Sequence, residues 1–91
     1  MELRWTNKAF SDLSRLHDFL AEVSPEAALG IVRSLVDAAG RLNSRPRVGE
    51  RLQEFEPREV RRILVGRYEL RYEIRRETLY VLRLWHTREN R

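Results

Sequence analysis

The clearest pattern along the chain is an alternation of hydrophobic and polar residues in its last third. From Tyr68 to Arg75, two tyrosines, a leucine and an isoleucine alternate with glutamates and arginines. This period-two pattern is typical of a strand with one buried face, so we expect the charged face of residues 69–75 to be exposed to solvent. Residues 78–86 carry apolar side chains on both faces, which is typical of a central strand. The sequence therefore predicts two neighbouring antiparallel strands joined by a turn at Arg76-Glu77.

The first half of the chain begins with a short strand pattern and then changes to helical spacing. Leu3 and Trp5 alternate with polar residues over positions 2–6, which predicts a strand with one apolar face. Ser24-Pro25-Glu26 is a strong start signal for a second helix. The apolar stripe predicted for the first helix is Phe10, Leu13, Leu16, Leu20 and Val23, with Asp12, Arg15, Asp18 and Glu22 on the opposite side. The stripe predicted for the second helix is Ala28, Ile31, Val32, Leu35, Ala39 and Leu42.

The segment from Ser44 to Glu59 has no periodic pattern and is predicted to be a long loop. Residues 60–65 predict another strand, and Gly66-Arg67 suits a two-residue hairpin turn. The order is β-α-α-β-β-β, and the two helices must bury their stripes against one face of the sheet. We therefore expect a single α+β domain over residues 1–91, with a small, mainly antiparallel sheet of order 1-4-3-2.

Composition and charge narrow the class of protein. The chain has 91 residues, of which 42% are hydrophobic and 35% charged, so one modest core is expected. It contains no cysteine and no secretory signal pattern, so we expect a cytoplasmic protein without disulfides. Residues 41–91 contain most of the basic residues, nearly all arginine, whose planar group suits carboxylates and phosphates. An acidic protein segment, a nucleic acid, or simply a solvated arginine-rich surface would fit this distribution.

His86, at the end of the last predicted strand, is the main candidate for acid-base chemistry. One hypothesis is phosphodiester cleavage, in which His86 protonates the leaving oxygen and Arg62 or Arg83 stabilises the phosphate charge. Glu50 or Glu54 would then be the base. The alternative is a strand-terminal histidine that is hydrogen-bonded to backbone. Two histidines without cysteine predict no metal site, and no phosphate-binding loop or dinucleotide motif indicates a cofactor.

Four local sequences stand out in the second half of the chain. They are Arg47-Val48-Gly49-Glu50-Arg51, Arg61-Arg62-Ile63-Leu64-Val65, Tyr68-Glu69-Leu70-Arg71-Tyr72 and Leu84-Trp85-His86-Thr87-Arg88-Glu89. Together with the order of elements, they resemble the RelE/ParE superfamily of bacterial type II toxins. The resemblance covers nearly the whole chain, and the ending is most similar to the ParE branch. It implies a toxin-antitoxin module of the kind that acts in plasmid stabilisation.

The resemblance implies a different activity for each branch of the superfamily. ParE-type toxins inhibit DNA gyrase, whereas RelE-type toxins cleave messenger RNA on the ribosome. RelE-type cleavage uses lysines and arginines with a C-terminal tyrosine, but here Lys8 is the last lysine and Thr87 follows His86. We therefore expect a gyrase inhibitor that acts by binding. The alternative is an mRNA endonuclease that uses Glu50, Arg62 and His86.

The resemblance also implies a cognate antitoxin, whose C-terminal segment wraps the toxin and folds on binding. Operator DNA would be contacted only through the antitoxin, and no membrane partner is expected. The arginine-rich strands would suit an acidic wrapping segment. The residues expected to contact the antitoxin or the target are Arg61, Arg62, Arg71, Arg83 and Arg88.

Overall fold

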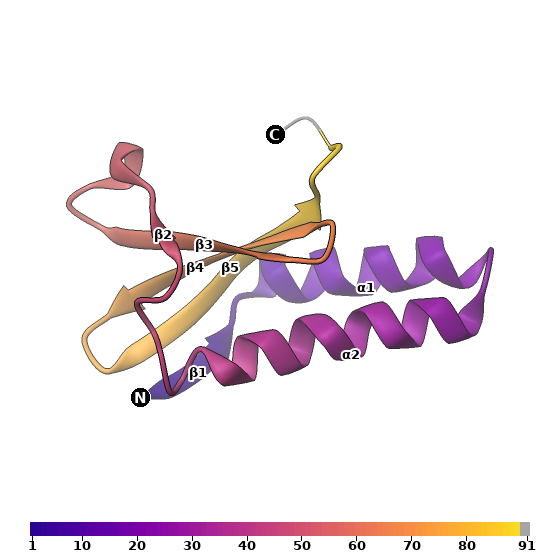
Figure 1. The fold of residues 1–91 in the computed structure, drawn as a ribbon, viewed down its shortest axis with the longest axis horizontal. Helices are drawn as coiled ribbons and strands as arrows, with labels where there is room; N and C mark the ends of the chain where they lie inside the picture. The colour runs from indigo at the N-terminus through magenta and orange to yellow at the C-terminus, as the bar shows by residue number, and fades with distance from the viewer. Residues whose placement is uncertain (90–91) are drawn as a thin grey trace.

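The computed structural model of the protein describes residues 1–89. The elements in chain order are β1 (Glu2–Trp5), α1 (Asn7–Ala21), α2 (Pro25–Arg41), β2 (Glu50–Arg51), the 3-10 helix η1 (Gln53–Phe55), β3 (Glu59–Val65), β4 (Tyr68–Arg75) and β5 (Thr78–His86). The helices α1 and α2 form a hairpin against one face of the sheet, and their connected ends project beyond it (Figure 1).

The strands form one mixed sheet in the order β1-β5-β4-β3-β2. β1 is parallel to β5, and the other neighbouring pairs are antiparallel. The α+β fold and the order of the four predicted strands are confirmed. The structure adds β2 at the outer edge, where Glu50 and Arg51 pair with Arg62 and Arg61. Two residues are too few for a periodic pattern, so this strand could not be predicted from alternation.

Both helices begin after a capping hydroxyl, and α2 begins where its sequence signal places it. The Thr6 hydroxyl accepts a hydrogen bond from the Ala9 backbone N–H at 3.1 Å, and Ser24 caps α2 in the same way, with Pro25 following as the first helical residue. The turn between β3 and β4 contains Gly66 at φ +60°, as a tight hairpin requires. The main core cluster lies between the helices and the sheet and contains Ala9, Ala39, Leu42, Leu70, Tyr72, Ile74, Leu79 and Val81.

The face of α1 that contacts the core matches the predicted stripe only in part, since Leu13 and Leu16 pack against the core. Phe10 and Val23, predicted to be in the apolar stripe, are 65% and 87% exposed, whereas Asp12, predicted to face solvent, is 4% exposed. The buried side of the helix is set by Ala9, whose small side chain lets α1 lie close to β5. Asp12 is one turn further along the same face, so it is buried too.

The charged face of β4 is also buried, although the alternation predicted it to be exposed. Glu69 and Glu73 are 7% and 4% exposed. Arginines cover both carboxylates: Arg58 forms two hydrogen bonds to Glu73, at 2.9 and 3.1 Å, and arginines of β3 and β4 bind Glu69. The long apolar stems of these arginines exclude water from the carboxylates while their charges neutralise them.

Candidate functional site

The sheet face opposite the helices carries a row of three arginines on neighbouring strands. Arg62 of β3 is paired with Arg71 of β4, which in turn is paired with Arg83 of β5. Carboxylates separate these like charges. Arg62 Nε donates to Glu50 at 2.8 Å, and Glu69 accepts from Arg62 at 3.3 Å and from Arg71 at 3.2 Å. The row is therefore an internally neutralised network, not a bare positive patch.

Arg71 lies between two aromatic rings. Its guanidinium carbon is 4.8 Å from the centre of the Trp85 ring and 5.5 Å from that of Phe55. Both distances are in the range of cation–π attraction, and the side chain is only 25% exposed. Arg71 thus joins η1, which carries Phe55, to β5.

Arg83 is held by the buried carboxylate of Asp12. Arg83 donates to both Asp12 oxygens, at 2.7 and 3.1 Å, and the Leu84 backbone N–H donates to one of them at 3.1 Å. Arg15 adds a hydrogen bond at 2.8 Å. Burial opposes ionisation of Asp12, but the hydrogen bonds from Arg83 and Leu84 outweigh it and lower the pKa of Asp12. This cluster joins α1 to β5 beyond Val81, where β1 no longer pairs with β5.

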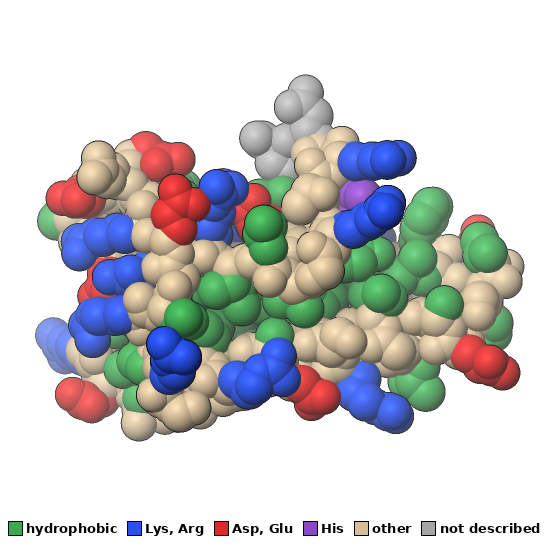
Figure 2. Space-filling view, in the orientation of Figure 1, with side chains coloured by type: hydrophobic (Ala, Val, Ile, Leu, Met, Phe, Trp, Pro, Cys, Tyr) green, Lys and Arg blue, Asp and Glu red, His purple; other side chains and the backbone are tan. Residues whose placement is uncertain are grey.

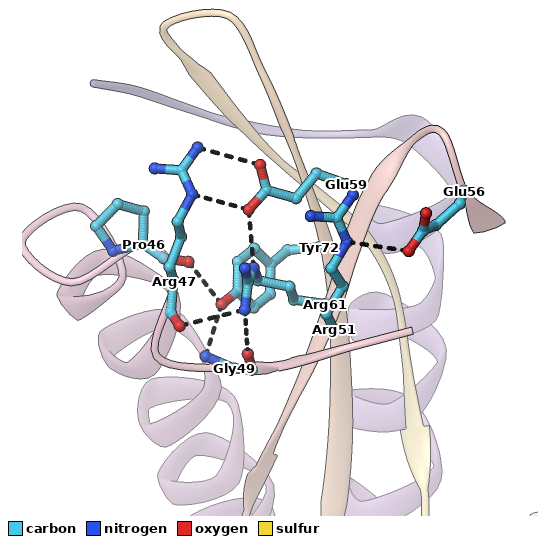
Figure 3. A network of polar contacts seen from close by, with 8 residues as sticks. All are labelled: Pro46, Arg47, Gly49, Arg51, Glu56, Glu59, Arg61 and Tyr72. Carbon is cyan, nitrogen blue, oxygen red and sulfur yellow. Dashed lines mark hydrogen bonds and ion pairs between the residues drawn. The ribbon is translucent and has the colours of Figure 1, made fainter. Parts of the chain in front are cut away.

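Arg61 anchors the loop between α2 and β2, as Figure 3 shows. Its guanidinium donates to the Gly49 carbonyl at 2.8 Å and to Glu59 at 2.9 Å, and its side chain is only 14% exposed. The buried Tyr72 hydroxyl donates to the Pro46 carbonyl at 2.7 Å and accepts from the Gly49 N–H at 3.0 Å. Arg61 therefore stabilises the loop, and little of it reaches the surface.

Gly49 is the position at which this loop touches the sheet most closely. A Cβ at this position would lie 2.6 Å from the Tyr72 hydroxyl and 2.7 Å from the Arg62 carbonyl oxygen. Both distances are shorter than van der Waals contact allows, so glycine is required here for the close approach. Burial raises the pKa of Tyr72, which keeps its hydroxyl protonated and able to donate.

His86 lies on the helix-facing side of the sheet, away from the other residues of the candidate ribonuclease site. It pairs with Tyr68, whose ring it contacts edge to face at 5.1 Å, and Tyr68 packs on Leu35 of α2. Glu50 and Arg62 contact each other on the opposite face. The structure thus brings Glu50 and Arg62 together but not His86. Glu54 lies in η1 with an exposed side chain.

The His86 ring also makes a hydrogen bond near the end of the described chain. Its Nδ1 accepts from the Arg88 backbone N–H at 3.1 Å. The Glu89 carboxylate in turn accepts from the His86 backbone N–H at 3.1 Å. Arg88 itself is exposed. These contacts match the alternative reading of His86 as a strand-terminal histidine that is hydrogen-bonded to backbone.

An apolar groove lies where the helical hairpin projects beyond the sheet, on both sides of Tyr68 and His86. We call it the helix-tip groove. It comprises two hollows of about 570 and 400 Å³ that share Tyr68 and His86 as lining residues. Arg15, Arg67 and Arg88 lie at its margins. Its apolar walls are formed by Leu16, Phe19, Leu20, Ile31, Leu35, Val65 and Leu84.

Sequence reasoning missed both Asp12 and the helix-tip groove. For Asp12 a signal was available, since it lies three residues after Ala9 and four before Leu16, on the face that the sheet buries. For the groove the signal was weaker. Phe19 is 69% exposed, but a single aromatic residue outside a helical stripe does not show that the helices extend past the sheet.

Among residues 1–89, no three or more histidine, cysteine, aspartate or glutamate side chains lie together in a way that could hold a metal ion. Within the same range, neither helix has the length and apolar character needed to cross a membrane.

The surface described above combines paired ions on the open face of the sheet with an apolar groove beside the helices. The sequence model of one family, the ParE toxin of the type II toxin-antitoxin system parDE, matches residues 3–91. The chain therefore belongs to the ParE toxin family. A solved structure of the chromosomal ParDE toxin-antitoxin system from P. aeruginosa is similar, with a TM-score of 0.78 and 25% sequence identity over 94% of this chain and 95% of that one. No curated protein matches the sequence.

Proposed function

We propose that this ParE-type toxin inhibits DNA gyrase and that a cognate antitoxin neutralises it. The observation that carries the proposal is the family match, which extends over residues 3–91. As part of the same proposal, the protein acts in the cytoplasm, its module contributes to plasmid stabilisation, and operator DNA is contacted only through the antitoxin.

The positions of the candidate catalytic groups support binding over RNA cleavage. A general acid and an arginine that stabilises the phosphate must reach the same phosphate group. Arg62 and Glu50 contact each other on the open face of the sheet, while His86 packs against Tyr68 on the helix-facing side. Cleavage of messenger RNA by these three residues would need a rearrangement of β5. Ribosome-dependent cleavage therefore remains the alternative to be tested.

The helix-tip groove and its arginines support the antitoxin part of the proposal. An amphipathic segment could bury its apolar side chains in the groove and place acidic residues beside Arg15 and Arg88. Among the five arginines predicted to make contacts, Arg62 and Arg88 have the most accessible positions and are proposed to contact a partner directly. Arg61, Arg71 and Arg83 would then act by holding the surface in shape.

The experiment is to express the toxin without its antitoxin and to compare two activities of the purified protein. One assay measures supercoiling by purified gyrase, and the other measures cleavage of messenger RNA on translating ribosomes. His86→Ala is the diagnostic variant, and His17→Ala is its matched control on α1. We expect gyrase inhibition by the wild type and by both variants.

Two other outcomes would contradict the proposal. Messenger RNA cleavage that is lost in His86→Ala but kept in His17→Ala would identify a ribonuclease. If cells that express the toxin without its antitoxin grow normally, and the purified toxin binds the antitoxin tightly, the protein is a binding module without toxicity. Antitoxin binding is measured separately, by co-purification of the protein encoded beside the toxin.

A further inference from the structure

The outer edge of β3 is paired along only part of its length. β2 pairs with Arg61 and Arg62, and the Leu52 N–H donates to the Val60 carbonyl, but among residues 1–89 no strand pairs with the outer side of residues 63–65. Backbone groups of successive strand residues point alternately to the two neighbouring strands. Since the Val60 carbonyl faces outward, the N–H and C=O of Leu64 face outward too.

This free edge is apolar as well as unpaired. The Leu64 side chain is 63% exposed, and its neighbours Ile63 and Val65 are partly buried against the core. Exposed edge strands are usually protected by charges, bulges or a covering element. Residues 63–65 carry no charge, their pairing with β4 has no bulge, and Leu64 is largely exposed, so the edge is suited to pairing with an added strand.

A groove runs beside this edge, between β3 and the C-terminal half of α2. We call it the edge groove; its volume is about 510 Å³. Figure 2 shows hydrophobic side chains gathered between the sheet and the helices on this face, with basic side chains along the margin over α2. The apolar lining of the edge groove is formed by Ala38, Leu42, Val48, Ile63 and Val65.

The margin of the edge groove carries positive charge that has no partner in the described chain. Arg41 and Arg45 line the groove and are exposed, and neither forms an ion pair with a carboxylate of residues 1–89. Arg61, Arg62 and Arg83, by contrast, are all in ion pairs. A free guanidinium beside an apolar groove suits a carboxylate on a bound peptide.

We propose that an extended, acidic segment of the antitoxin pairs with β3 at Leu64 and lies along the edge groove. Its backbone would bond to the outward N–H and C=O of Leu64, its apolar side chains would enter the groove, and its carboxylates would bind Arg41 and Arg45. A helix could not use the free backbone groups of the edge. The identification of the partner as the antitoxin rests on the proposed function, whereas the chemistry of the segment rests on the edge groove alone.

The test measures the affinity of purified toxin variants for the full-length protein encoded beside the toxin. Leu64→Pro removes the outward N–H, as prolines on edge strands do, while Leu64→Ala keeps it and removes only the exposed side chain. Arg41→Glu combined with Arg45→Glu reverses the charge of the margin. Arg33→Glu is the control, since Arg33 is an exposed arginine of α2 outside the groove.

We expect Leu64→Pro to weaken binding by about fivefold, the value of one net hydrogen bond, compared with Leu64→Ala. The double charge reversal should weaken it by about tenfold or more, and Arg33→Glu should change it by less than about twofold. Equal affinities for Leu64→Pro and Leu64→Ala would overturn the proposal, as would equal losses at the groove margin and at Arg33.

A second measurement does not depend on the folding of any variant. Hydrogen exchange of the Leu64 amide is compared in the free toxin and in the complex, and we expect slower exchange on binding. Unchanged exchange at Leu64 in a tight complex overturns the edge-groove proposal and leaves the proposed function intact. If the neighbouring protein does not bind at all, the proposed function fails. Protection of Leu64 by a DNA duplex instead would assign the groove to nucleic acid and overturn the proposal.

Discussion

Replacing Asp12 with asparagine keeps the size of the side chain but removes its charge. The Asp12 side chain is 3% exposed and accepts hydrogen bonds from Arg83, from Arg15 and from the Leu84 backbone N–H. In the variant, the amide group presents two donors to a site that contains only donors. The Arg83 guanidinium then loses its carboxylate partner.

The loss in free energy of unfolding depends on how much of the ion pair between Asp12 and Arg83 is buried. Removing one partner of a fully buried pair costs about 3–5 kcal/mol. Since the Arg83 side chain is 33% exposed, water compensates part of the loss, and we expect Asp12→Asn to lower the free energy of unfolding by about 2–3 kcal/mol. In a domain of this size the melting temperature would fall by roughly 8–24 °C.

The assay is urea unfolding at neutral pH, with Arg15→Ala as the matched control. Arg15 binds the same carboxylate, but its side chain is 63% exposed, so its removal should cost less than about 1 kcal/mol. A double-mutant cycle between Asp12 and Arg83 isolates their interaction. If Asp12→Asn and Arg15→Ala cost the same, the reasoning is refuted, because burial of the pair would then have no energetic role.

Because of Asp12, we also expect the free energy of unfolding to depend on pH. The pKa of Asp12 is lower in the folded state than in the unfolded chain, so the unfolded state binds the proton more readily. The stability that Asp12 contributes is therefore present above its unfolded pKa of about 3.9 and is lost as the pH falls through the folded pKa. Below about pH 4 the stability of wild type should fall more steeply than that of Asp12→Asn. Parallel curves would contradict this assignment.

Two further predictions concern the loop and the aromatic contacts. Gly49→Ala should destabilise the protein by about 1–3 kcal/mol in thermal unfolding, because the added Cβ would lie 2.6 Å from the Tyr72 hydroxyl. The control is Gly40→Ala in α2, where a Cβ would meet open space, and it should be neutral or stabilising by up to about 1 kcal/mol. Arg71→Ala should uncover the Trp85 ring and increase the quenching of tryptophan fluorescence by acrylamide. The control is Arg75→Ala, which should not increase the quenching, because Arg75 lies over the Tyr80 ring. Equal quenching in the two variants would refute the assignment.

The sequence predicted the helices and the four longer strands because these depend on local, periodic patterns. It predicted the strand order because the apolar side chains on both faces of residues 78–86 indicate a central strand. It could not predict that the charged face of β4 is buried. Alternation shows that Glu69 and Glu73 share a face with arginines, but not that arginines from other segments fold over them. Such burial depends on contacts between residues distant in the chain, for example Arg58 and Glu73, which are 15 positions apart.

The candidate site was predicted less well than the fold, for a geometric reason. Glu50, Arg62 and His86 are plausible together as a set of chemical groups, and two of them do meet. Whether the third joins them depends on strand register, since a shift of one residue moves a side chain to the other face of the sheet. The pairing of His86 with Tyr68 places it against the helices. Sequence alone did not determine this register.

The projection of the helical hairpin beyond the sheet means that the parts of the molecule differ in local stability. Near the hairpin connection, Phe19 and Val23 are 69% and 87% exposed, so little apolar surface holds these turns in place. Amides there should exchange with solvent through local fraying, whereas those beside the fully buried Leu70 and Tyr72 exchange only when the whole domain unfolds. A partner seated in the helix-tip groove would therefore bind the least stable part of the toxin and make it rigid.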